Sequence, residues 1–503
     1  MALLYALLLI GIIYWMGTII YDLFLHPLAH IPGPMLWRAS RLSFIYSLVS
    51  GRLVSDIRRF HETYGDIVRT APNEVSFARV DAWHDVCNPS KSHKALLRNA
   101  VWFKAPPGQP ENLVTTINTV DSARMRQVAG LAFTDRALMR QEHIIRAYSH
   151  LLIDRLSRRV DDESNPATGT VINVVDWFNW FTFDSIGELA LGESFGCLHN
   201  TKHHPWVELL SNSIRVVMAL AAATRYYRGL ESLLLRLVPA KLRKMQADHY
   251  ATALEKIQRR MSSQSERPDF ASIFLENNPK FEKMSKQEVE STLSMILIAG
   301  SETTATALCG ALCYLTQCPE VLRKLQQEIR QRFETDADIT LRALHQLSYL
   351  NAAIAETLRL CNPVAGGILR YVPEGGATVC GLSLPKDTHV TLNPIAMSLS
   401  PANFHRANEF LPERFLPEKE RPAVFDNDVR ESQKPFGLGT RSCLGKSLAM
   451  AEMRLVLAQL VWNFELSQAE GPVLRWNELK TFIVVQKVPI YVVLKKRLQD
   501  SRI

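Results

Sequence analysis

The sequence has little that would place it among nucleic-acid-binding, zinc-binding or disulfide-rich proteins. Its 58 Lys and Arg against 50 Asp and Glu give a net charge of +8, well short of a nucleic-acid-binding footprint. Eight cysteines are scattered over 503 residues. Cys309, Cys313 and Cys318 share one predicted helix but lack histidines at zinc spacing. We interpret these three as packing residues, and the others, Cys443 apart, as reduced cytosolic thiols.

Several larger patterns are also missing. The chain has no internal repeat, no low-complexity tract and no glycine-rich motif for flavin or nicotinamide binding, which excludes repeat proteins and self-sufficient flavoenzymes. What is present is 47% hydrophobic and 21% charged residues, typical of a globular protein with a large core. The small basic excess would suit an acidic protein partner or a lipid surface.

The first long apolar run predicts a membrane anchor. Residues 2–21 carry no charge, and twenty residues at a helical rise would cross a hydrocarbon core. A cleaved signal peptide is the alternative, but no basic segment precedes the run and no small-residue cleavage site follows it. The proline-rich residues 26–34 would end the helix. Arg38 and Arg41 just beyond the anchor indicate that this side is cytoplasmic.

A second stretch, Phe436-Gly437-Leu438-Gly439-Thr440-Arg441-Ser442-Cys443-Leu444-Gly445-Lys446, stands before a predicted helix from Ser447 to Phe464. Glycines let the backbone pass close to a bulky partner. A helix N-terminus and the nearby Arg441 would lower the pKa of the Cys443 thiol and favour thiolate. An isolated cysteine is more often a small buried hydrophobe, but this set of neighbours favours a functional one.

The stretch resembles the haem-binding signature of the cytochrome P450 family, Phe-x-x-Gly-x-Arg-x-Cys-x-Gly, at every fixed position. The resemblance implies haem b as cofactor, Cys443 as the axial ligand of its iron, and Phe436 beside it. It also implies that Arg126, Arg370 and Arg441 bind the haem propionates. Family members commonly carry Trp or His four residues before the first of these arginines, whereas this chain has Ser122. Arg124 is the alternative to Arg126.

A long apolar helix is predicted over residues 288–314, interrupted by Ala299-Gly300-Ser301-Glu302-Thr303-Thr304. A carboxylate and hydroxyls are costly in such a helix unless they are used. The segment resembles the P450 motif in which the glycine lets haem approach and an acid and an alcohol relay protons to the oxygen being activated. By that resemblance, Glu302 and Thr303 are the candidate catalytic residues.

A further pair, Glu356 and Arg359, shares one face of a helix predicted over residues 349–360. With Arg414 in Pro412-Glu413-Arg414-Phe415, it resembles the family's Glu-x-x-Arg pair and the arginine that completes its buried triad. The resemblance implies a structural role. Residues 206–234, which are apolar and aromatic, resemble the family's roof over the substrate channel.

The resemblance extends from the anchor to the C-terminus and predicts a mainly α protein with a smaller β region, the cytochrome P450 fold, after one N-terminal transmembrane helix. Residues 1–25 would be the anchor and residues 26–503 the catalytic domain, on the cytosolic side of the endoplasmic reticulum membrane. The implied function is a haem-thiolate monooxygenase acting on an apolar small molecule, with electrons from NADPH through cytochrome P450 reductase. Membrane lipid is an expected partner and nucleic acid is not.

The sequence around Gly375-Gly376, Asn403-Phe404 and Glu452-Met453-Arg454 is similar to that of fungal P450s of specialised metabolism. It indicates a terpenoid or polyketide intermediate as substrate, by analogy alone. One alternative is a P450-like isomerase or dehydratase that rearranges an oxygenated substrate without external electrons. It would keep Cys443 but need not keep Glu302 and Thr303. A haem-dependent sensor is a third class.

Overall fold

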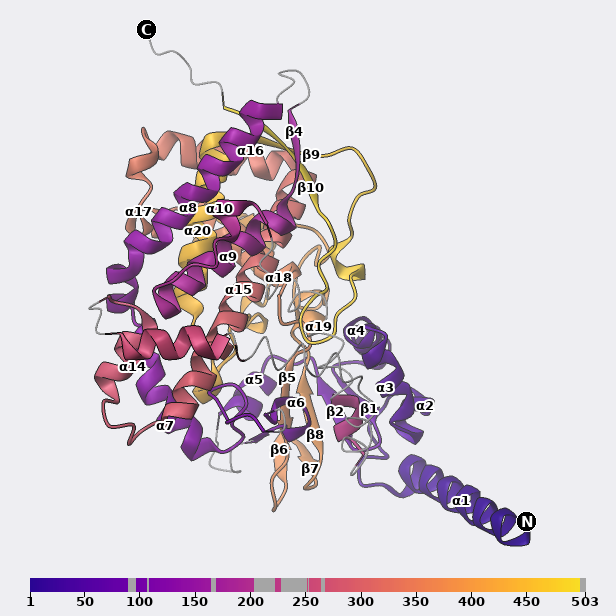
Figure 1. The fold of residues 1–503 in the computed structure, drawn as a ribbon. Coiled ribbons are helices and arrows are strands. Elements are labelled where there is room, and N and C mark those ends of the chain that lie inside the picture. Colours follow the sequence, from indigo (N-terminus) through magenta and orange to yellow (C-terminus); the bar gives the residue numbers. More distant parts are fainter. Residues whose placement is uncertain are drawn as a thin grey trace.

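The computed structural model describes residues 1–88, 96–105, 108–163, 169–202, 222–227, 251, 253–263 and 267–497. Most of the described body is helical, with the β structure gathered toward one side and the N-terminal helix projecting away from it (Figure 1). The mainly α architecture with a smaller β region is therefore confirmed.

The helices and strands fall in the expected regions. The α-helices are α1 Ala2–Ile20, α2 Met35–Ala39, α3 Leu42–Val49, α4 Leu53–Tyr64, α5 Ala82–Cys87, α6 Ala100–Phe103, α7 Thr119–Ala129, α8 Asp135–Glu163, α9 Val174–Leu191, α10 Cys197–Asn200, α14 Phe270–Asn277, α15 Lys286–Gln317, α16 Pro319–Arg332, α17 Leu341–His345, α18 Ser348–Leu360, α19 Pro394–Ser398 and α20 Lys446–Asn463. The strands are β1 Ile67–Ala71, β2 Glu74–Phe77, β3 Leu97–Arg98, β4 Thr170–Asn173, β5 Ile368–Tyr371, β6 Ala377–Val379, β7 Leu382–Leu384, β8 His389–Leu392, β9 Phe464–Gln468 and β10 Tyr491–Lys496.

Short 3₁₀ turns and one π-helical segment connect these elements. They are η1 Tyr21–Leu25, η2 Gly130–Phe133, η3 Asp336–Asp338, η4 Pro412–Phe415, η5 Ala423–Phe425, η6 Arg430–Ser432, η7 Gly439–Arg441 and η8 Trp476–Glu478. The π-helical segment η1 directly continues α1. The helix then ends at His26, whose backbone is extended, as the prolines that follow require.

Three sheets account for the described strands. The largest has the order β1-β2-β8-β5-β3, the second β4-β10-β9, and β6 pairs with β7. Strand β2 runs parallel to β8, although more than 300 residues separate them, with Glu74 opposite His389. The other pairs are antiparallel. The sheet that holds β5 therefore joins strands from residues 67–98 to strands from residues 368–392.

Helix α15 runs through the centre of the helical layer and packs closely against α9 (Figure 1). Its start is fixed by a capping box between Ser285 and Glu288. A β-carbon at Gly300 would lie 2.9 Å from Ile186 of α9, so the glycine allows the two helices to approach. That Gly300 also lets haem approach, as the family resemblance implies, stays a prediction.

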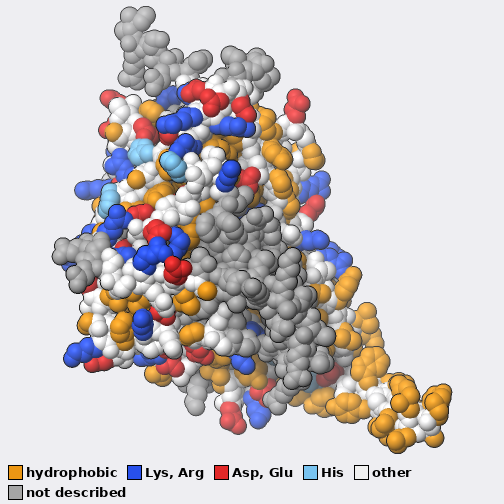
Figure 2. All heavy atoms as spheres, viewed as in Figure 1, with side chains coloured by type: hydrophobic (Ala, Val, Ile, Leu, Met, Phe, Trp, Pro, Cys, Tyr) orange, Lys and Arg blue, Asp and Glu red, His pale blue; other side chains and the backbone are white. Residues whose placement is uncertain are grey.

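The N-terminal helix is long and apolar enough to cross a membrane. The candidate span is Ala2–Leu25. No residue of Ala2–Ile20 is buried, and Figure 2 shows its hydrophobic side chains exposed. Helix α15 passes the same length and composition test but is mostly buried, which is typical of a core helix. The expected apolar helix at residues 2–21 is thus present and continues to Leu25.

The sequence misplaced some strands. Polar and apolar residues alternate over residues 480–494, a pattern that predicts strands, but only β10 and an isolated bridge between Thr481 and Val485 form there. Strands β4 and β9 were not predicted. Each is short and pairs with β10, and a four- or five-residue strand beside a long helix leaves little periodicity to detect.

A fully buried ion network connects α18 to the loops that follow it. Arg359 grips Glu356 in a bidentate fork, with N–O distances of 2.7 Å for both bonds, and Arg414 Nε lies 3.2 Å from Glu356 Oε1. These three side chains have no solvent exposure. Asp428 is a fourth member, paired with Arg414. Arg359 also donates to the carbonyls of Ser398, Ala407 and Glu409.

A second buried polar group lies where α9, α15 and α20 meet. Glu452 is 2% exposed. It accepts a 2.8 Å hydrogen bond from Ser185 Oγ and another from the Thr304 hydroxyl. Burial raises its pKa to about 7, against the opposing effect of these hydrogen bonds. The carboxylic acid is thus held by two hydroxyls, one of which belongs to the residue after Thr303.

We expect Arg359→Ala to destabilise the protein by about 3–5 kcal/mol, because it leaves the Glu356 carboxylate buried without its main cation. Haem incorporation and soluble yield should fall together, and chemical denaturation should measure the loss. The matched control is Arg323→Ala, which removes the same i, i+3 pairing from an exposed pair with Glu320 and should change little. A stable, haem-loaded Arg359→Ala protein would contradict this structural role.

The Glu452 carboxyl predicts a pH-dependent stability. Its pKa is higher in the folded state than its usual 4.5, so the stability it supports is present at low pH and is lost as pH rises toward and through about 7. The loss amounts to about 3 kcal/mol at high pH. Glu452→Gln should remove this dependence of stability on pH. The free energy of unfolding of each protein is measured at acidic and at neutral pH, and the change between the two pH values should be smaller in the variant. Parallel slopes would refute the assignment.

Candidate functional site

Cys443 lies in a tight loop between η7 and the start of α20. Its backbone N–H donates a 2.8 Å hydrogen bond to the Phe436 carbonyl. Gly437 and Gly439 have φ angles of +71° and +74°, a region that side chains disfavour. A β-carbon at Gly439 would lie 2.5 Å from the Cys87 carbonyl oxygen. The glycines therefore allow the loop to turn while packed against α5.

All eight cysteines are described, and only Cys443 is exposed. Protein atoms nevertheless surround its sulfur, and this burial raises the pKa of the thiol. The Gly445 N–H and Arg126 have smaller, opposite effects that lower that pKa. The Cys443 side chain is thus accessible although protein atoms surround it. The expected lowering of the pKa is wrong in net direction for the thiol alone, and a bound metal cation would reverse it. Burial also raises the pKa of Cys309 and Cys313 to about 12.

Four arginines converge near Cys443. Arg98 and Arg370 stand directly opposite each other on β3 and β5, and like charges at such positions repel. Burial and the neighbouring Arg441, Arg370 and Arg126 lower the pKa of Arg98 well below its usual range. Burial and the same repulsion lower the pKa of Arg441 to about 10. A cluster of four guanidinium groups needs anions between them.

The polar atoms around this cluster also lack partners. The buried Nε of Arg98 and the hydroxyls of Thr116 and Ser122 make no hydrogen bond within the described residues. Thr116 offers its carbonyl to Arg441, and Ser122 lies one turn before Arg126 in α7. Unpaired donors beside four cations fit a cofactor that carries carboxylates. The residues present therefore fit haem, with the cluster around its propionates and Cys443 at its iron.

The predicted propionate arginines are brought together, and their alternative is not. Arg126 acts on both Cys443 and Arg441 electrostatically. Arg124 instead binds Glu288 of α15, at 2.8 Å, and Asp121. Arg98 was missed by sequence reasoning. The only signal available was an arginine in a two-residue strand, which no motif marked.

The middle of α15 presents a second internal surface. Ala299 is exposed and Ile298, Gly300 and Thr303 are only partly buried, although most of α15 is buried. The Thr303 hydroxyl donates a 2.7 Å hydrogen bond to the Ala299 carbonyl, so its oxygen lone pairs stay available to accept a proton-bearing partner. Exposure in the centre of a core helix indicates that this face also borders an internal space.

Glu302, for which the motif implied a role in relaying protons, forms an ion pair with Lys487. Its Oε2 lies 3.0 Å from Lys487 Nζ, with the lysine 2% and the glutamate 14% exposed. Lys487 also donates a 2.8 Å hydrogen bond to Asn179 Oδ1 of α9. Lys487 was missed because it lies almost 200 residues downstream, in a segment that was expected to be a strand.

Only residues 222–227 of the expected roof are described, and the rest of 206–234 lies outside the described residues. Tyr226 accepts a 3.0 Å hydrogen bond from Trp102 Nε1, and Arg41 lies 4.1 Å from the centre of its ring. Arg225 donates to the Val101 and Lys104 carbonyls. This short piece of the roof therefore packs on α6 and on the segment before α3.

Comparison with known proteins gives a consistent result. The family model for cytochrome P450 matches residues 31–494. The chain is 36% identical over 479 residues to the cytochrome P450 monooxygenase astA of Talaromyces wortmannii, covering 95% of this chain and 94% of that protein. It is 36% identical over 491 residues to the versicolorin B desaturase stcL of Emericella nidulans, covering 97% of both.

The averantin hydroxylase of Dothistroma septosporum is similar at 35% identity over 490 residues, 97% of this chain and 90% of that enzyme. These relatives are fungal, and their names describe a monooxygenase, a desaturase and a hydroxylase. The family match covers the Cys443 loop, the arginine cluster and α15 alike. The chain belongs to the cytochrome P450 family of haem-thiolate monooxygenases.

Proposed function

We propose that this enzyme inserts one oxygen atom into an apolar terpenoid or polyketide intermediate of a fungal secondary-metabolite pathway. The observation that carries the proposal is the exposed thiol of Cys443 beside four converging arginines. The fungal relatives, named for hydroxylation and desaturation, support the pathway context. The substrate class is inferred by analogy.

The cofactor in this proposal is haem b. Its propionates would lie between Arg98, Arg126, Arg370 and Arg441, which would relieve the repulsion among them. Cys443 would bind its iron, with the Gly445 N–H directed at the sulfur. When bound, a thiolate-ligated haem supplies the activation of O₂ that oxidation of an unreactive C–H bond requires.

Electrons in this proposal come from NADPH through cytochrome P450 reductase, because the sequence has no nicotinamide or flavin motif of its own. The net charge of +8 would favour an acidic partner surface. Residues 1–25 would anchor the enzyme in the endoplasmic reticulum membrane and residues 26–503 would form the cytosolic catalytic domain. The exposed apolar span Ala2–Leu25 supports this division.

Proton delivery falls to Thr303 and Glu302. Thr303 uses its hydroxyl proton on the Ala299 carbonyl, which leaves its oxygen to orient a water or an incoming proton donor. The buried Lys487 fixes the position of the Glu302 carboxylate through their 3.0 Å ion pair. In this proposal the two side chains have different roles. Thr303 orients the proton donor, and Glu302, ion-paired with Lys487, is the carboxylate from which protons are supplied.

The thiolate assignment predicts the result of replacing Cys443. Cys443→Ser should abolish the characteristic absorption band of the reduced, carbon monoxide-bound protein, because a hydroxyl does not give thiolate ligation. The control is Cys318→Ser at the end of α15, a half-buried cysteine away from the arginine cluster, which should retain the band. A band that survived in Cys443→Ser would refute the assignment.

The proton-delivery assignment predicts uncoupling. Thr303→Ala should bind haem and substrate normally and still consume NADPH, but form less product and more hydrogen peroxide, by about 10-fold or more in coupling ratio. Lys487→Met should slow turnover, because Glu302 then loses the cation that fixes its position. The control Thr316→Ala removes the same kind of hydroxyl bond, to Leu312 in α15, far from Ala299.

Unchanged coupling in Thr303→Ala, or equal uncoupling in Thr316→Ala, would contradict the relay. The same assays separate a monooxygenase from an isomerase or dehydratase. A monooxygenase incorporates oxygen from isotope-labelled O₂ and depends on NADPH and reductase. Product formed from a peroxide substrate alone, without label from O₂, would overturn the proposed function itself.

A further inference from the structure

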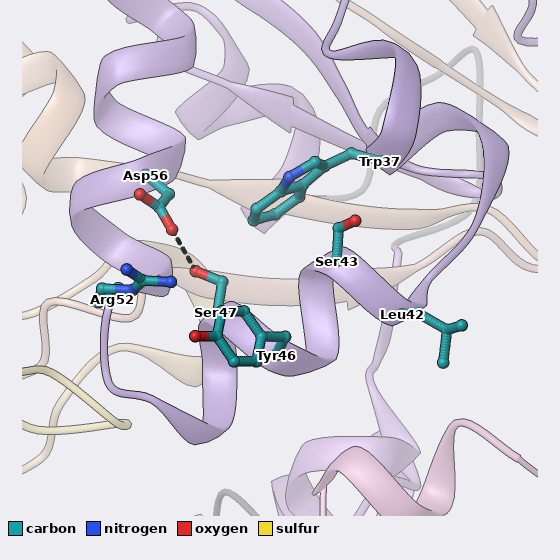
Figure 3. Close-up of a pocket in the computed structure, with 7 residues that line it drawn as sticks. All are labelled: Trp37, Leu42, Ser43, Tyr46, Ser47, Arg52 and Asp56. Atoms are coloured by element: carbon teal, nitrogen blue, oxygen red, sulfur yellow. Dashed lines mark hydrogen bonds between the residues drawn. The ribbon is translucent and has the colours of Figure 1, made fainter.

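A pocket far from Cys443 in the sequence lies where α3 meets the first turn of α4. It encloses about 410 Å³, within the roughly 300–1,000 Å³ typical of small-molecule sites. Figure 3 shows its lining, with Trp37 of α2 above, Tyr46 below, and Asp56 and Arg52 together on one side. The remaining lining residues are Leu42, Ser43 and Ser47. None of these residues belongs to the site described above.

The pocket offers one positive and one negative group that do not neutralise each other. Arg52 and Asp56 form no ion pair with each other, although both are described. Asp56 Oδ2 accepts a 2.6 Å hydrogen bond from Ser47 Oγ, which fixes the carboxylate. Arg52 lies 5.2 Å from the centre of the Tyr46 ring and donates through Nε to Ser50 Oγ at 3.3 Å. Arg52 is exposed, and its guanidinium makes no other hydrogen bond to the described residues.

The pocket is held next to the end of the N-terminal helix. Arg38 of α2 donates to the Leu23 and Ala29 carbonyls, at 3.4 Å and 2.7 Å. Arg69 of β1 donates to the Asp22 carbonyl at 2.7 Å. In Figure 1, α2, α3 and α4 are the elements of the body next to α1. These bonds fix the pocket relative to the point where the chain leaves the apolar span.

Large apolar side chains are exposed on the same two short helices. They are Met35 and Leu36 of α2, at 66% and 74% exposure, and Leu42 and Tyr46 of α3, at 56% and 64%. Figure 2 shows that hydrophobic surface continues from the N-terminal helix onto the adjoining part of the body. Such a surface beside an apolar span indicates contact with lipid, and Tyr and Trp favour the headgroup level.

We propose that this pocket, lined by Trp37, Tyr46, Arg52 and Asp56, binds the zwitterionic headgroup of a membrane phospholipid. Arg52 would pair with the phosphate, which suits a guanidinium. Asp56 would pair with the ammonium group, and the aromatic rings would face that cation. The acyl chains would leave over Leu42 toward Met35 and Leu36. This inference rests on the proposed membrane attachment for its biological setting, but the pocket can be tested without it.

The test uses the full-length, haem-loaded protein in detergent micelles with equimolar phosphatidylcholine and phosphatidylglycerol of identical acyl chains. After repurification, mass spectrometry quantifies the retained lipid. The unchanged protein should retain phosphatidylcholine in excess. Asp56→Asn should reduce that preference about 10-fold, because the trimethylammonium group of choline, which has no N–H to donate, loses the carboxylate that balances its charge. Arg52→Gln should reduce retention of both lipids, and Asp56→Glu should keep the preference.

The matched control is Asp81→Asn, which neutralises an exposed carboxylate paired with Arg79 and should leave lipid retention unchanged. Absence of a phosphatidylcholine preference in the unchanged protein would overturn the site, as would its persistence in Asp56→Asn. Stronger retention of phosphatidylglycerol would identify a cationic site that selects anionic headgroups, and this result would also overturn the proposed zwitterion site. Carbonate washing of membranes tests attachment through residues 1–25 separately, because both pocket variants leave that helix intact.

Discussion

The network of Glu356, Arg359, Arg414 and Asp428 is the constraint on which the rest of the structure depends. Four charged groups with almost no solvent exposure are stable only while each has its partners. Arg359 also holds three backbone carbonyls between Ser398 and Glu409. The chain then passes through Arg414 and Asp428 to reach the Cys443 loop. The position of the reactive sulfur therefore depends on a set of bonds that contain no catalytic atom.

The described core contains two arrangements of charged groups whose burial is energetically unfavourable. Arg98 and Arg370 face each other across paired strands, and Lys487 lies buried against Glu302. Neither arrangement would be selected for stability alone, since a well-packed apolar core is as stable as a buried ion pair or more so. Groups whose burial reduces stability are frequent at functional sites, and both pairs include residues to which we assign a functional role.

Sequence reasoning predicted the parts that short local motifs encode. The Cys443 loop, the helix around Glu302 and Thr303 and the pair Glu356 and Arg359 each lie within a few residues, and the structure contains the elements expected for them. Arg98 and Lys487 were missed because their roles arise only from tertiary contacts, one through a two-residue strand and the other from almost 200 residues away. Strands β4 and β9 were missed for a similar reason, since both are defined by pairing with β10.

The convergence of four arginines has a consequence for the life of the protein in the cell. Without an anion between them, their mutual repulsion opposes closure of the fold, and a carboxylate-bearing ligand that binds only the folded form relieves it. The amount of folded enzyme is then tied to the supply of that ligand. Chains made when the ligand is scarce spend more time partly open and are removed by proteases. Electrostatic repulsion in this site would thus make the amount of folded enzyme depend on the availability of its cofactor.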